Sequence, residues 1–474
     1  MIERRWLAWP RLPAIGVVAV LGAAAGALPL KYGAVALVGG IAVLAILVNP
    51  VLGLAALTVA VPFGPSGDTG SNLPITPTDA LVILILGAAL LACFSRRKTA
   101  VVLTGAFWPS VAFILVALLS ATFATDFLVS VKELLRWVEL LGILIVTATF
   151  CGRSESRYLV VVALLLASSL EALLGWVQFF LRRGPASFRI GPFLRAYGTF
   201  GQPNPFGGYL AMTLPIAIAL VFWRRPWAGR PNRLTIVAFG AAGICGLALA
   251  MSLSRGAWMG VAVGLIVLYW AQMRRDALVV LVAVAAVLVL FGLDALHVVP
   301  SSIASRLDQV FVYFGVFDAS RVVPNAQNYS IVERMAHWQA AWNMYLAHPI
   351  LGVGPGHYAL AYPEFRVNNF WIYPLGHAHN IYLNVMAETG FLGIAAYLAQ
   401  FVAWLAVILA GRRRASAPVD RALAAGVLAS FVAVAIHNGF DDLYVHGLNA
   451  QFGLLVGLAA TIGRGRPRDV EESW

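Results

Sequence analysis

Residues 376–390, GHAHNIYLNVMAETG, join the longest polar segment of this 474-residue chain to a long apolar one. The polar segment runs from 294 to 375, and from Ile381 to about Ala410 the sequence is apolar. His379 and Asn380 therefore mark the predicted start of a membrane helix. Histidine titrates nearest neutral pH, which makes His379 a candidate proton acceptor at the lipid–water boundary. The plainer alternative is a histidine that only caps the helix and touches lipid headgroups.

The composition is that of a membrane protein. Hydrophobic residues make up 61% of the chain and charged residues 11%, with a mean hydropathy of +0.83, whereas soluble proteins carry about 25% charged residues. We predict an all-α polytopic membrane protein. The net charge of +12 comes from basic clusters between apolar runs, which argues for headgroup contact and against nucleic-acid binding. The three cysteines lie in or beside predicted helices and imply no disulfide framework.

Apolar runs of about 17–25 residues can cross a bilayer. The runs at 33–48 and 51–63 are short and are separated by Asn49-Pro50, so 12 to 14 membrane helices are expected. The candidate spans are 12–30, 33–48, 51–63, 77–94, 105–123, 132–150, 158–181, 204–223, 233–252, 256–272, 276–293, 381–410, 421–438 and 447–463.

The basic clusters predict the orientation of the chain. An even number of spans separates consecutive clusters, so all can lie in the cytoplasm, with both termini and with the long loop 294–380 outside. Six of the eight histidines then fall in that loop, and the other two flank the outer turn 439–446. Arg189, Arg195 and Arg255 also fall outside, against the charge rule, which calls for a functional explanation.

The long loop is expected to contain amphipathic helices. Residues 333–346 have helical periodicity with aromatic side chains on one face, and the glycine-rich turn 352–356 follows. That turn lacks the Lys-Ser/Thr of a phosphate-binding loop. Trp338, Trp342 and Trp371 suit an aromatic belt at the membrane surface.

Two groups of residues could hold a metal ion. His377 and His379 are spaced like a weak metal pair, with no carboxylate close by in sequence. Asp441 and Asp442, flanked by His437 and His446, form a second candidate, although we expect solvated turn acids there. We predict that no metal is bound.

Four segments, taken in order, carry a family resemblance: RAYGTFGQPNP at 195–205, SLSRGAW at 252–258, HPILGVGPG at 348–356 and the stretch 379–390. Together they resemble the bacterial O-antigen ligase superfamily, which includes O-antigen ligases, O-antigen polymerases and protein O-oligosaccharyltransferases. The resemblance covers about 190–400. It divides the chain into N-terminal helices (1–189), a ligase-related region with the outer loop (190–400), and C-terminal helices with a cytoplasmic tail (401–474).

The resemblance implies a multi-pass glycosyltransferase of the GT-C type in the bacterial plasma (inner) membrane. The donor would be a glycan on undecaprenyl diphosphate. The acceptor would be a sugar hydroxyl, either of lipid A-core in a ligase or of another lipid-linked repeat in an O-antigen or exopolysaccharide polymerase. No cofactor is implied. The outer loop has no Asp-x-Asp motif to hold Mg²⁺, so a metal-independent, inverting transfer at the extracytoplasmic face is expected.

The resemblance also implies roles for particular residues. His379 corresponds to the family histidine at the end of the outer loop and would be the general base. Arg255 and Arg195 would bind the diphosphate, with Arg189 as the competitor of Arg195, because arginine binds phosphate bidentately and stays protonated. Supporting or substrate-binding roles fall to Asn204, Gln202, Asn380 and Glu388.

Other polar groups leave alternatives open. Lys132, Arg136 and Glu139 could touch a phosphate or distal sugars, but mutual salt bridges are the expected arrangement. Glu171 lies in the middle of a predicted helix and needs a partner that the sequence does not name.

A lipid transporter or flippase is the alternative function from another class of protein. It would spread ionisable residues through the mid-membrane helices, whereas here they gather at the outer ends. A structural or chain-length-control protein would not need the arginines and histidine on one face.

Overall fold

The computed structural model describes residues 30–64, 76–95, 100–223, 232–273, 317–325 and 328–464. Within these ranges the protein is helical apart from one antiparallel hairpin, β1 (Arg189–Ile190) and β2 (Phe193–Leu194). The all-α polytopic membrane fold is confirmed. The predicted span 276–293 and nearly all of the span 12–30 lie outside the described residues.

The helices reproduce the predicted spans to within a few residues. Apolar side chains with few charges let a helix satisfy its own backbone hydrogen bonds within lipid. Six described helices are long and apolar enough to cross a membrane: α4 (Pro77–Ser95), α7 (Ser154–Phe180), α8 (Pro203–Val221), α9 (Arg233–Ser252), α15 (Ile381–Arg414) and α16 (Pro418–His437). The other helices of the bundle are α2 (Leu30–Val48), α3 (Pro50–Phe63), α5 (Phe107–Ala121), α6 (Phe127–Phe150), α10 (Arg255–Leu268), continued by the π-turn η2 (Tyr269–Met273), and α17 (Leu448–Thr461).

The centre of the bundle consists of α8, α16 and α17, which are buried along nearly their whole length. Small residues let the helices approach closely, as lipid-embedded helices require. Gly260 and Gly264 of α10 face Ala433 and Ala429 of α16, and a Cβ at Gly260 would lie 2.3 Å from the Ala433 carbonyl oxygen. This tight core holds the outer ends of the central helices in fixed positions.

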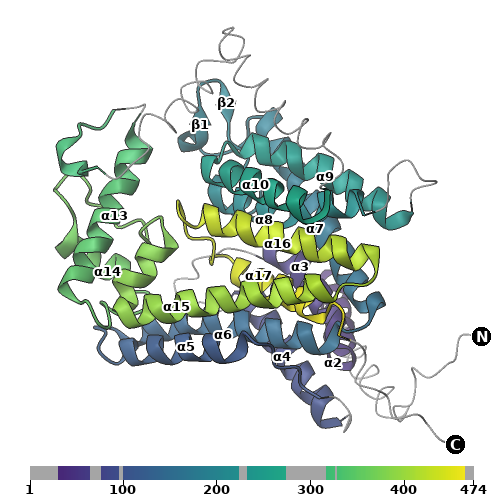
Figure 1. Cartoon of the computed structure of the whole chain (residues 1–474). Coiled ribbons are helices and arrows are strands. Elements are labelled where there is room, and N and C mark those ends of the chain that lie inside the picture. The colour runs from purple at the N-terminus through teal and green to yellow at the C-terminus, as the bar shows by residue number, and fades with distance from the viewer. Residues whose placement is uncertain are drawn as a thin grey trace, which may run out of the picture.

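A separate unit, named the outer unit here because it comes from the predicted outer loop, covers one end of the bundle. The helices α13 (Tyr329–Ala347) and α14 (Tyr358–Phe365) lie side by side there, next to the start of α15 (Figure 1, left). Two short 3-10 turns, η1 (Ala186–Phe188) and η3 (Ala319–Arg321), complete the described elements. The predicted amphipathic helix at 333–346 is thus present as α13.

The predicted uninterrupted span from Ile381 needs a correction. Gly390 has φ +65° and ψ −163°, which breaks α15 into two parts. The amides of Phe391 and Leu392 donate to the carbonyls of Pro349 and Ile350, and a Cβ at Gly390 would lie 2.3 Å from the Ile350 carbonyl carbon. Glycine accepts this backbone without a steric cost. Residues 381–389 therefore pack with the outer unit, and the part after Gly390 remains long enough to cross the membrane.

The orientation can be tested by cysteine labelling. In a variant whose Cys93, Cys151 and Cys245 are replaced by alanine, a single cysteine at the exposed Asn369 should react with a membrane-impermeant maleimide in intact cells. A cysteine at the exposed Arg413, in the last turn of α15, should react only after permeabilisation. The reverse pattern would put the outer unit in the cytoplasm and contradict the predicted topology.

Candidate active site

His379 lies in a short turn between the outer unit and α15. Its backbone is left-handed, with φ +52°. Its amide donates to Nδ1 of His377 (3.0 Å), and its carbonyl accepts from the indole N–H of Trp338 (3.3 Å). Asn380 is the N-cap of α15 and accepts from the amides of Tyr382 and Leu383. A left-handed histidine costs conformational energy, so these contacts are needed to hold the ring in place.

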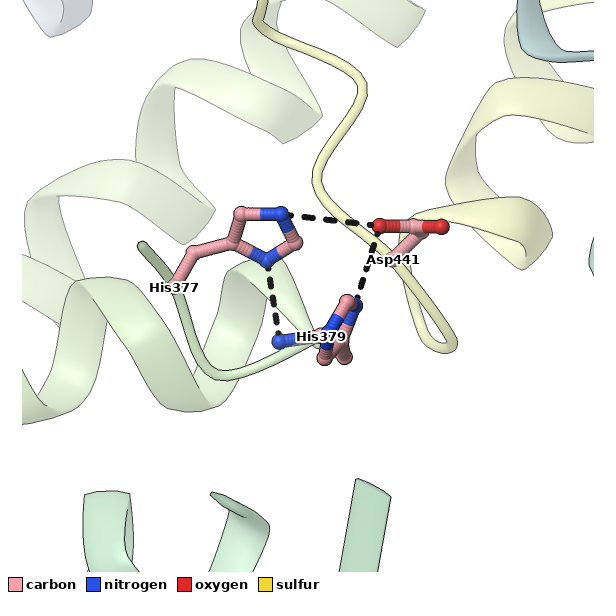
Figure 2. A group of neighbouring side chains, drawn as sticks. All are labelled: His377, His379 and Asp441. Carbon is pink, nitrogen blue, oxygen red and sulfur yellow. Dashed lines mark hydrogen bonds and ion pairs between the residues drawn. The ribbon is translucent and has the colours of Figure 1, made fainter. Parts of the chain in front are cut away.

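The imidazole of His379 faces a buried carboxylate. Its Nδ1 lies 3.3 Å from Oδ1 of Asp441, in the turn that follows α16. His377 approaches the same oxygen, with Nε2 at 3.8 Å. Figure 2 shows the three side chains converging from two separate loops. The Asp441 side chain is 5% exposed, whereas the His379 side chain is 19% exposed, so the histidine remains accessible to solvent.

Burial and hydrogen bonding set the protonation of this pair. Burial alone would raise the pKa of Asp441, but the hydrogen bond from His379 and the positive charge of Arg334 hold that pKa below its usual range. Burial lowers the pKa of His379, and the bond to Asp441 offsets only part of this effect. At neutral pH the carboxylate is ionised and the imidazole neutral. An ionised carboxylate only accepts, so Nδ1 carries the proton and Nε2 keeps its lone pair.

The other oxygen of Asp441 begins a chain of hydrogen bonds. Asn204, in the first turn of α8, donates to Oδ2 of Asp441 (2.8 Å). The guanidinium of Arg195 donates to the side-chain oxygen of Asn204 (2.8 Å) and, through Nε, to the carbonyl of Ser252 (2.9 Å). The chain Arg195–Asn204–Asp441–His379 therefore links segments that are far apart in the sequence.

Two more arginines, on α10 and α13, both donate to Ser330. Arg255, the first residue of α10, donates to the hydroxyl of Ser330 (3.0 Å). Arg334, one helical turn further along α13, donates to the carbonyls of Phe440 (3.2 Å) and Ser330 (3.3 Å). Three arginines thus contact the residues that surround the His379–Asp441 pair.

The inner wall of the site is aromatic. His337 is buried, with Nδ1 2.8 Å from the hydroxyl of Tyr358, and its ring stacks on Tyr362 at 4.6 Å. It also meets the ring of His379 edge-on at 5.8 Å. Burial lowers the pKa of His337 to about 3. His337 therefore stays neutral and supports the catalytic candidate as a packing partner.

One comparison with family models gives a match. Residues 240–398 match the model described as O-Antigen ligase. The match supports the O-antigen ligase and polymerase superfamily for this part of the chain. The match includes Arg255, Arg334 and His379, whereas Arg195, Asn204 and Asp441 lie outside it. A search of curated proteins found no match.

The predicted site residues separate into two groups. Arg195, Asn204, Arg255 and His379 lie in or next to the hydrogen-bonded cluster. Arg189 is exposed on β1, opposite Leu194 in the hairpin.

The remaining three predicted residues have local structural contacts. Gln202 is the exposed N-cap of α8, without a side-chain cap hydrogen bond, and Asn380 caps α15. The carboxylate of Glu388 accepts from the amide of Tyr358 (3.0 Å), which fixes the start of α14.

The structure also corrects several expectations. Asp441 and Asp442 were expected to be solvated, but they are 4% and 8% exposed, because the turn is packed beneath the outer unit. Trp371, at 4% exposed, is not part of a lipid belt. Trp338 holds His379, which leaves Trp342 as the exposed belt residue.

The charged residues of α6 are partly paired with one another. Arg136 forms an ion pair with Glu133 at 2.7 Å, which agrees with the expected salt bridge within the helix, although Glu133 rather than Glu139 is its partner.

Sequence reasoning missed Asp441, Arg334 and Trp338 as site residues. Asp441 carried a signal, since it is an acid in an outer turn between two histidines. Arg334 and Trp338 are four residues apart and share one face of α13, but nothing in the sequence shows which face meets His379.

A metal ion is the alternative use of the same atoms. One ligand atom each from His377, His379 and Asp441 lies within 4.8 Å of the others, a donor set that Zn²⁺ accepts. However, Nδ1 of His377 already accepts the His379 amide, so its Nε2 carries the proton and donates toward Asp441. A metal at that Nε2 would break the bond that holds His379. The geometry therefore favours a carboxylate bonded to the N–H of His379, with Nε2 of His377 at the longer distance of 3.8 Å.

Chelation should separate the two arrangements. EDTA treatment of the purified protein should leave its activity unchanged, because the described contacts use His377 Nε2 as a donor. His377→Asn is the matched control, since an asparagine oxygen can replace Nδ1 as acceptor while Nε2 is lost. Activity that disappears on chelation and returns with Zn²⁺ in the wild type, but not in His377→Asn, would establish the metal site.

Proposed function

We propose that this protein transfers a glycan from undecaprenyl diphosphate to a sugar hydroxyl at the extracytoplasmic face of the bacterial inner membrane, as an O-antigen ligase-like enzyme. The single observation that carries the proposal is the hydrogen-bond chain Arg195–Asn204–Asp441–His379. It connects a cationic group suited to a leaving diphosphate with a base suited to an incoming hydroxyl. The O-Antigen ligase match supports the reaction class.

The arginines suit the donor. Negative charge grows on the diphosphate as the glycosidic bond breaks, and a preorganised guanidinium stabilises it without reorganisation. Arg195 and Arg255 are anchored by Ser252 and Ser330, respectively. Arginine binds phosphate oxygens bidentately and stays protonated throughout. Arg334 adds positive charge beside the same turn.

The histidine suits the acceptor. In the proposed step, Nε2 of His379 takes the proton of the acceptor hydroxyl as its oxygen attacks the anomeric carbon. The bond between that carbon and the diphosphate oxygen breaks, and its electron pair leaves on the diphosphate. A single displacement inverts the anomeric centre. Asp441 holds the Nδ1–H tautomer and stabilises the imidazolium that forms, as the aspartate of a catalytic triad does.

The acceptor decides between ligase and polymerase. Lipid A-core as acceptor makes the protein an O-antigen ligase, and another lipid-linked repeat makes it an O-antigen or exopolysaccharide polymerase. The proposed chemistry at His379 is the same for both. Purified protein supplied with one lipid-linked donor and each acceptor in turn distinguishes them by the product formed.

The proposed base makes a sharp prediction. His379→Ala should lower the rate of transfer by about 10²–10⁴-fold without lowering membrane abundance or donor binding. His379→Gln should be equally impaired, because glutamine cannot take the proton. Asp441→Asn should also be impaired, since an amide N–H₂ facing Nδ1 favours the wrong tautomer. The measurement is single-turnover transfer in detergent, with the enzyme in excess over the donor.

Two matched controls accompany these variants. Asp442→Asn keeps the oxygen that accepts the Tyr444 amide and should remain active. His377→Asn keeps an acceptor for the His379 amide and should lose much less activity than His379→Ala. Near wild-type transfer by His379→Gln would reduce this histidine to a binding residue and remove the proposed base.

The proposed diphosphate site makes a separate prediction. Arg195→Ala and Arg255→Ala should each weaken undecaprenyl diphosphate binding about 10–100-fold, because each loses charged hydrogen bonds. Lysine at either position should restore little, since a point charge does not reproduce the bidentate fork. Arg189→Ala, on the exposed hairpin, is the control and should bind normally. A loss confined to Arg189→Ala would transfer the role to that residue.

A further inference from the structure

Residues 195–199 follow β2 and form neither helix nor strand, yet each of their backbone amides donates a hydrogen bond. The amide of Arg195 donates to the carbonyl of Phe188 (3.1 Å), and that of Ala196 to the carbonyl of Met251 (3.0 Å). The next three amides, at 197, 198 and 199, donate to side chains of α7. Five consecutive amides thus have partners outside the segment, which leaves its backbone little freedom next to Arg195.

Two buried side chains of α7 provide these contacts. The oxygen of Gln178 accepts the amides of Tyr197 (3.1 Å) and Gly198 (2.7 Å), and its Nε2 donates to the carbonyl of Gly198 (2.7 Å). Glu171 accepts the amide of Thr199 (2.7 Å) through Oε1 and its hydroxyl (3.2 Å) through Oε2. The two residues are seven apart, about two helical turns, and share one face of α7.

The fit between α7 and this segment is close. Gly198 has φ +57°, and a Cβ there would lie 1.8 Å from Oε1 of Glu171. Glu171 is fully buried and Gln178 is 8% exposed. A carboxyl group inside a membrane helix is costly, which favours a functional explanation. Among the described residues, the hydrogen bonds of the Glu171 carboxylate go to Thr199, in the segment that carries Arg195.

We propose that Gln178 and Glu171 are positioning residues that fix Arg195 for the leaving diphosphate. They hold the backbone after Arg195, while Asn204 and Ser252 hold its guanidinium. The inference rests on the proposed function, because it assigns the purpose of this rigidity to phosphate binding. It adds two residues of α7 that make no contact with His379 among the described interactions.

A double-mutant cycle tests the proposal. Gln178→Met keeps the length of the side chain but removes its hydrogen bonds, and it should weaken binding of glycan-free undecaprenyl diphosphate about tenfold. The double variant Gln178→Met/Arg195→Ala should bind no more weakly than Arg195→Ala alone, because the position of an absent guanidinium no longer matters. Gln451→Met, at a buried glutamine of α17, is the matched control and should bind normally.

Glu171 gives a second, independent comparison. Glu171→Gln keeps an acceptor for the Thr199 amide and should bind and transfer as the wild type does, whereas Glu171→Met should resemble Gln178→Met. All variants are compared at equal folded fraction, measured by thermal unfolding. Fully additive losses in the cycle, or normal binding by both methionine variants, would overturn the positioning role. Normal binding by Arg195→Ala would instead overturn the proposed diphosphate site itself.

Discussion

The structure around the outer end of the bundle depends on one buried charge, the carboxylate of Asp441. A buried carboxylate is stable only when hydrogen bonds replace the water it has lost. Here His379 and the amide of Asp442 serve one oxygen, and Asn204 serves the other. Because these partners come from three different segments, satisfying one charge also brings the loops of the site together.

The outer unit supplies the second constraint. It rests on the first part of α15 through the crossing at Gly390, where the carbonyls of Pro349 and Ile350 meet the amides that follow the break. This docking places Trp338 on the carbonyl of His379 and the aromatic wall behind its ring. A left-handed histidine is held in place by packing and backbone contacts from two helices, as a strained residue at a functional site requires.

The charged groups of this cluster are connected to one another. Arg334 contacts the Asp441 turn through the carbonyl of Phe440, and the guanidinium of Arg195 reaches Asp441 through Asn204. Positive charge from Arg334 helps to keep Asp441 ionised, which preserves the tautomer of His379. On the donor side, the amides that follow Arg195 are held by α7, so both arginine position and base protonation are set before a substrate binds.

The sequence by itself predicted the membrane spans and the amphipathic helix α13, and it put forward Arg195, Arg255 and His379 as candidate site residues. Hydropathy and helical periodicity act over tens of residues, and an outer-face arginine stands out against the charge rule. The tertiary structure alone decided that Asp441 is buried, that Arg195 and not Arg189 joins the cluster, and that Trp338 supports the histidine. Asp441 lies 62 residues from His379 and 237 from Asn204. No local pattern encodes contacts over such separations, because they depend on how the helices pack against one another.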